Sequence, residues 1–87
     1  MSEELTAEEI NAHFSAMDDS VNLINDTIAD DSDALEMFGS QEEVKLMMKR
    51  NTDHLELQLV KDWAVADNRD KSSYTDAITA GLAYITG

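Results

Sequence analysis

Carboxylates are the side chains of this sequence whose type and spacing could do chemistry. Asp30, Asp31 and Asp33 lie within four positions, and carboxylate oxygens are ligands that Ca²⁺ prefers. An EF-hand loop that began at Asp31 would place Leu35 at a ligand position and Glu36 at the position that needs glycine. We therefore predict no specific calcium site. We interpret the cluster as the end of a helix, because Asp is a poor helix former and a good capping residue.

Other catalytic constellations are missing from the sequence. Cysteine does not occur, His13 and His54 are the only histidines, and the zinc, phosphate-loop and dinucleotide motifs are absent. Paired carboxylates act as acid and base only where a cleft separates their pKa values, and a chain of 87 residues has little room for such a cleft. We predict that the protein is not an enzyme and has no catalytic residue, metal ion or cofactor. Both histidines are expected at the surface or half buried.

Negative charge dominates the chain and lies in its first half. The formal net charge is −13, and all six Lys and Arg residues lie in residues 45–87. Direct binding to nucleic acid or to an anionic membrane needs a basic face, so we expect neither. No apolar run approaches the roughly 20 residues that span a bilayer, and the acidic N-terminus lacks a signal-peptide pattern. We expect a single intracellular domain over residues 1–87.

Two helices are predicted in the acidic half. Thr6 and Glu9 form a capping-box pattern, and apolar residues then recur at alternating spacings of four and three, as in a helix that packs along another helix. We predict a helix over residues 6–30 and a short helix over 33–38 that a glycine ends. A single kinked helix over 6–38 is the alternative. The apolar seam consists of Ile10, Phe14, Met17, Val21, Ile24 and Ile28.

A long central helix is predicted over residues 41–66. Ser40 and Glu43 form a second capping box. Residues 54–60 also alternate between polar and apolar side chains as a strand does, but a lone strand would leave its edges unpaired. The helix has a wide apolar arc, which is either covered from two sides or left for a partner. The residues of this arc that we assign to partner binding are Leu55, Leu57, Leu59, Val60 and Trp63.

Two further sets of side chains have more than one interpretation. Lys45, Lys49 and Arg50 form a basic stripe on the central helix. We expect this stripe to pair with the acidic first helix, each exposed pair contributing about 0–1 kcal/mol; an acidic partner is the alternative. A second set belongs to the core or forms an adaptable apolar contact surface. It consists of Met17, Met37, Met47, Met48, Phe38 and Trp63.

The last helix is predicted over residues 74–86, with Ser73 and Asp76 at its start. Gly81 lies inside this helix, where glycine costs about 0.5–1 kcal/mol relative to alanine. We therefore expect another helix to approach closely at Gly81. Together the segments predict an all-α fold, a small three- to four-helix bundle with antiparallel neighbours and short loops.

The second half of the chain resembles a family. Residues 50–56 read R-N-x-x-H-L-E and residues 77–85 read A-I-x-A-G-x-A-Y-I. This pairing is similar to that in small, largely uncharacterised helical proteins of tailed bacteriophages, over residues 49–86. The resemblance implies a small phage protein encoded among virion genes, and it carries over no catalytic residue. Many members have Lys or Arg after the glycine, whereas this chain has Leu82, which favours burial at that position.

Two functions are compatible with these features. The first is a virion-associated structural protein, in the virion or in the host cytoplasm during infection. It would act as a capsid decoration, cement or connector completion factor by docking a helix face on another phage protein. The second is an acidic mimic of nucleic acid that inhibits a basic host DNA- or RNA-binding protein. The acids assigned to partner binding on one helix face are Asp19, Asp26, Asp30 and Asp33. A homodimer through paired seams is a third interpretation, which like charges disfavour.

Overall fold

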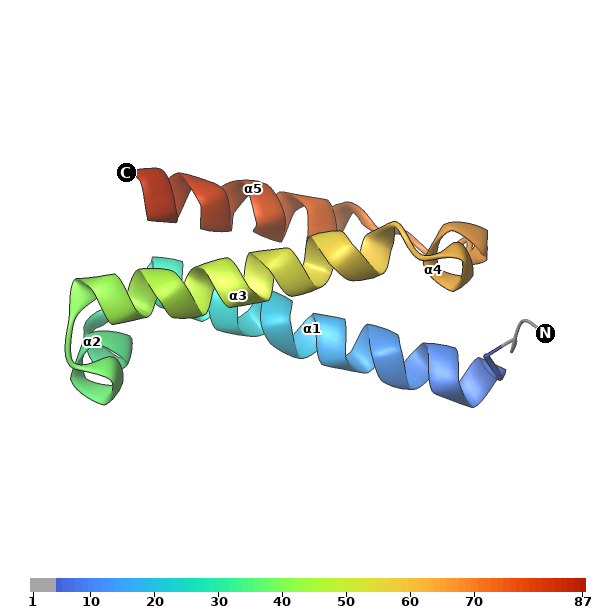
Figure 1. The fold of residues 1–87 in the computed structure, drawn as a ribbon, viewed down its shortest axis with the longest axis horizontal. Helices are drawn as coiled ribbons and strands as arrows, with labels where there is room; N and C mark the ends of the chain where they lie inside the picture. Colours follow the sequence, from blue (N-terminus) through green and yellow to red (C-terminus); the bar gives the residue numbers. More distant parts are fainter. Residues whose placement is uncertain (1–4) are drawn as a thin grey trace.

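The computed structural model describes residues 5–87, in which the chain forms five helices and no strand. The long helices are α1 (Ala7–Ala29), α3 (Gln41–Leu59) and α5 (Ser72–Thr86), and the short ones are α2 (Ser32–Phe38) and α4 (Asp62–Ala66). Each long helix packs against the other two, and α2 and α4 lie at opposite ends of the molecule (Figure 1). The predicted all-α fold, a small helical bundle, is confirmed. Within residues 5–87, none of the helices is long and apolar enough to cross a membrane.

Side-chain caps set the bounds of α1. The Thr6 hydroxyl accepts a hydrogen bond from the Glu9 backbone N–H at 3.1 Å, and the Glu9 carboxylate accepts one from the Thr6 backbone N–H at 3.0 Å. At the other end Asp30 has an extended backbone, and its carboxylate accepts hydrogen bonds from the backbone N–H and the hydroxyl of Ser32. These bonds hold the chain in a turn between α1 and α2. The alternative of one kinked helix over residues 6–38 is therefore wrong.

The central helix is shorter than the predicted span of 41–66. Ser40 caps α3 as expected, accepting a hydrogen bond from the Glu43 backbone N–H at 3.2 Å. The chain then leaves helical geometry at Lys61, whose backbone is extended, before α4 begins. In an unbroken helix Ala64 would point about 180° away from Leu55, whereas both side chains are fully buried in the bundle. Burial of α4 against the core therefore breaks the helix, although no Gly or Pro marks the position.

The core lies between the three long helices. The apolar seam of α1 faces it as predicted, except at its C-terminal end, where Ile28 is exposed and Thr27 is buried. Successive residues of a helix are rotated by about 100°, so where Thr27 faces the core, Ile28 turns towards solvent. The buried apolar residues are Phe14, Met17, Val21, Ile24, Val44, Met47, Met48, Leu55, Ala64, Tyr74 and Ala77.

The α5 helix approaches α3 closely at Gly81. A Cβ atom at this position would lie 2.5 Å from Thr52 Cγ2 and 3.5 Å from Ile24 Cγ2, so only glycine fits without a shift. Because Gly81 faces inward, the next residue is rotated by about 100°, and Leu82 remains 42% exposed. The predicted burial of Leu82 is wrong. The helix also begins at Ser72 rather than at residue 74.

Aromatic and polar contacts tie α4 and the loop that precedes α5 to α1. Trp63 stacks on His13 with ring centroids 4.8 Å apart. The Arg69 guanidinium carbon lies 3.8 Å from the centroid of the Phe14 ring, and the same group donates a hydrogen bond to the Asn11 side chain at 2.8 Å. These contacts close the end of the bundle at which α1 begins.

The basic stripe does not pair with α1. Lys49 forms an ion pair with Asp53 at 3.0 Å, one turn further along its own helix. Within residues 5–87 the other ion pair joins Arg69 to Asp67. The predicted pairing of the stripe with the first helix is therefore wrong, because the face of α1 that meets α3 is the apolar seam. The carboxylates of α1 and α2 face solvent instead.

Gly81→Ala is expected to destabilise the fold, although alanine is the better helix former. The added methyl group meets Thr52 Cγ2, and overpacking costs about 1–3 kcal/mol, more than the about 0.5–1 kcal/mol gained in the helix. In a Thr52→Ser background, which lacks that methyl group but keeps the hydroxyl that donates to Lys49 O, the same change should be neutral or stabilising. Urea unfolding of the four chains measures both effects. A stabilising Gly81→Ala in the unaltered background would contradict the close approach.

Stability is expected to fall above pH 10 because of Tyr74. Burial, followed by the hydrogen bond that its hydroxyl donates to Asp18 at 2.7 Å, raises the pKa of Tyr74 from 10.0 to about 12. The unfolded chain loses this proton first, so the contribution of the neutral hydroxyl is complete below pH 10 and is lost between pH 10 and about 12. Burial also raises the pKa of Tyr84.

The measurement is urea unfolding across this pH range for the parent chain, Tyr74→Phe and Tyr84→Phe. We expect the alkaline loss of stability to be smallest in Tyr74→Phe. An equal loss in all three chains, or ultraviolet absorbance showing both phenols ionising near pH 10, would be inconsistent with a buried Tyr74.

Candidate functional site

The predicted apolar arc is divided by the fold. Leu55 is fully buried in the core, and Leu59 and Trp63 are half buried against it. Leu57 and Val60 remain 57% and 71% exposed. With Asp53 and Glu56, these two residues line a depression at the C-terminal end of α3, which we call the terminal depression. The arc is thus partly core and partly free surface, because Leu57 is rotated by about 200° from Leu55 on α3 and Val60 lies where the helix ends.

The fold brings the predicted acidic residues closer together than the residues of the apolar arc. Asp26, Asp30 and Asp33 line one groove on the outside of α1 and α2, whereas Asp19 is exposed two turns before it on α1. The helix break at Asp30 folds α2 back towards α3 and so forms this groove. We call it the acid-rimmed groove. It has a volume of about 330 Å³ and is lined by Leu23, Asp26, Thr27, Asp30, Asp33, Ala34, Met37, Phe38 and Met47.

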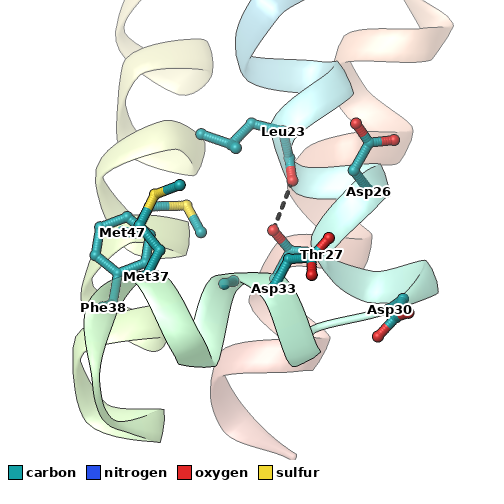
Figure 2. Close-up of a pocket in the computed structure, with 9 residues that line it drawn as sticks. Leu23, Asp26, Thr27, Asp30, Asp33, Met37, Phe38 and Met47 are labelled. Carbon is teal, nitrogen blue, oxygen red and sulfur yellow. Dashed lines mark hydrogen bonds between the residues drawn. The ribbon is translucent and has the colours of Figure 1, made fainter.

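The groove has two chemically different sides. Figure 2 shows Met37, Phe38 and Met47 gathered on one side, while Asp26 and Asp30 lie on the other. Met47 is buried, whereas Met37 is 79% exposed and Phe38 is partly exposed at the end of α2. A soft, adaptable apolar surface therefore adjoins carboxylates.

Electrostatics make the rim of the groove anionic. The hydrogen bonds from the hydroxyl and the backbone N–H of Ser32 lower the pKa of Asp30, which keeps this carboxylate charged well below neutral pH. The Thr27 hydroxyl donates to Leu23 O at 2.8 Å (Figure 2), which satisfies this buried group within the helix. Within residues 5–87, no three His, Asp or Glu side chains are placed so that they could hold a metal ion. The arrangement suits binding of a group that is both cationic and apolar.

The two histidines lie away from this groove. His13 stacks on Trp63, and His54 Nδ1 lies 3.0 Å from the hydroxyl of the buried residue Ser20. His13 is exposed and His54 is half buried, as the sequence predicts. Both serve contacts between helices.

Sequence reasoning missed the apolar side of the groove in part. Leu23 lies outside the heptad seam of α1 and was not assigned a role by its spacing. Met37, Phe38 and Met47 belong to the set that was interpreted as core or contact surface. The structure divides that set, because Met17 and Met48 are fully buried. A short segment rich in Met and Phe after a helix-ending Asp cluster was the available signal.

Oxidation is expected to distinguish the groove from the core. Met37 is 79% exposed, whereas Met17 and Met48 are inaccessible to solvent, and oxidation of methionine to the sulfoxide follows exposure. Under dilute hydrogen peroxide Met37 should be oxidised at least about tenfold faster than either core methionine. Mass spectrometry of proteolytic fragments provides the rates, and Met48 on α3 is the internal control. Equal rates at Met37 and Met48 would show that the core is not closed.

No protein-family model, curated protein or solved structure matches this chain.

Proposed function

We propose that this protein is a non-enzymatic structural component of a bacteriophage particle. It acts as a capsid decoration, cement or connector completion factor, and it binds another virion protein through a helix face. It reaches the virion from the host cytoplasm during infection. The resemblance of residues 49–86 to small phage proteins supports a phage as the origin of the chain. The exposed apolar surface of the bundle supports binding to another protein.

The acid-rimmed groove is the observation that carries this proposal. The long helices already bury their apolar faces against one another, so Leu23, Met37 and Phe38 are not needed to complete the core. Large apolar side chains that gather beside polar ones on a surface are typical of interaction sites. The terminal depression at Leu57 and Val60 adds a second, smaller surface of the same kind. A protein that holds particle components together needs such surfaces.

The test is mass spectrometry of purified particles from the phage that encodes the chain. We expect the chain in particles at a reproducible copy number. Leu23→Glu places a charge in the groove and should abolish incorporation, whereas Leu82→Glu places the same charge on α5 at a residue of equal exposure, 42%, and should not. Absence of the unaltered chain from particles would reject this function, whereas equal incorporation of both variants would reject the groove as the docking surface.

An acidic mimic of nucleic acid is the second candidate function. The observation in its favour is that the ion pairs within residues 5–87 lie in the second half of the chain, so the carboxylates of α1 and α2 are not neutralised by Lys or Arg. These carboxylates could occupy the basic groove of a host nucleic-acid-binding protein. Binding to such a protein should then weaken steeply with salt. Association that does not respond to salt would exclude mimicry.

A further inference from the structure

The acid-rimmed groove has apolar side chains that residues 5–87 leave uncovered. None of the seven residues of α2 is buried, although Ala34 and Leu35 pack against the core. Met37 and Phe38 follow on the same short helix and remain exposed beside Leu23. A surface helix normally places polar residues on the side that faces water. This part of α2 is therefore available to another molecule.

The negative charge of the groove determines which kind of molecule can bind there. Figure 2 shows Asp26 and Asp30 on the side of the groove away from Met37 and Phe38, with Asp33 between the two sides beside Thr27, and within residues 5–87 the lining contains no Lys, Arg or His. The acidic half of the chain adds to the same negative field, because residues 1–44 contain no Lys or Arg. A bound group must therefore be cationic at the Asp side and apolar at the Met37 and Phe38 side. A second copy of this chain, with its net charge of −13, fits poorly.

The shape of the groove favours a helix as the occupant. A volume of about 330 Å³ is at the lower end for small-ligand pockets, and most of the lining side chains are exposed, so the groove cannot enclose a ligand. It has room for a few side chains of a longer segment. The described part of the chain offers no sheet edge to which a strand could be added. A helix that lies with its apolar face in a groove between helices is a common mode of recognition that fits this surface.

We infer that the acid-rimmed groove binds a basic amphipathic helix of a partner protein. The apolar residues of that helix, spaced at i, i+3 or i+4, and i+7, lie against Leu23, Met37 and Phe38. Its Lys or Arg residues pair with Asp26 and Asp33. This inference rests on the proposed function for placing the partner in the virion, but the chemistry of the partner follows from the groove itself.

The experiment uses the full chain and a synthetic peptide of about four helical turns. The peptide has leucine on one face and lysine on the other, and the control peptide has the same composition with leucine and lysine alternating. Fluorescence anisotropy at physiological salt measures affinity, and backbone amide chemical shifts locate the site. We expect the amphipathic peptide to bind at least about tenfold more tightly than the alternating one, with shifts concentrated in α2 and the last turns of α1.

Matched variants separate the groove from the general charge of the protein. Asp26→Asn with Asp33→Asn should weaken binding about tenfold, whereas Asp62→Asn with Asp76→Asn removes the same charge from exposed sites outside the groove and should change affinity less than about twofold. Asp30 is left unaltered because it caps the turn before α2. Phe38→Ala should weaken binding about tenfold, and Leu82→Ala on α5, at a residue of similar exposure, should not. Circular dichroism checks that each variant is folded.

Several results would overturn this inference. Equal losses of peptide affinity in the two pairs of Asp variants would indicate a general attraction between opposite charges. Amide chemical shifts that map to the terminal depression would place the peptide outside the groove. A dimer whose groove amides are protected would make a second copy of the chain the occupant. Absence of the chain from particles together with selective binding of the amphipathic peptide would reject the virion role and support the groove. Failure of the peptide test with normal incorporation into particles would reject the groove and keep the virion role.

Discussion

The contact between Gly81 and Thr52 brings α5 against α3, where Ile24 of α1 also meets it. Because a glycine is used at this point, the three long helices come close enough to bury their apolar faces against each other along one axis. The polar groups buried with them are hydrogen-bonded, since the Thr52 and Thr27 hydroxyls donate to carbonyl oxygens of their own helices and the Ser20 hydroxyl pairs with His54 of α3. Every apolar side chain outside this axis must then lie at the ends or on the surface.

The two short helices, α2 and α4, carry apolar residues that lie outside the three long helices. α4 turns back so that Trp63 covers His13 and one end of the core, and Ala64 is buried. α2 closes the other end less completely, because Ala34 and Leu35 pack inward while Met37 and Phe38 stay at the surface. The carboxylates of the turn before α2 lie beside them. The function proposed for the chain follows from this unequal closure of the two ends.

The sequence predicts most of the fold because its local signals agree with each other. The capping residues Thr6 and Ser40 begin α1 and α3 as expected, and Gly39, with a φ of 87°, ends α2. The break at Lys61 is not visible in the sequence, because it depends on burial of Ala64 and Trp63 rather than on a turn residue. Leu82 and Ile28 show the same limit, since their exposure depends on the exact rotation of a helix against its neighbours. For the site, Asp26, Asp30 and Asp33 could be found by spacing, whereas Leu23 becomes significant only once α2 has folded back beside it.

The central claim is that the three long helices form one cooperative core, whereas α2 is held weakly and presents its apolar side to solvent. Native-state hydrogen exchange tests this claim most directly. We predict that the slowest amides in the middle of α1, α3 and α5 share one opening free energy equal to that of global unfolding, and that the amides of α2 open at a much lower free energy. Protection of α2 equal to that of the long helices, or the absence of any slowly exchanging amide in α5, would contradict the account.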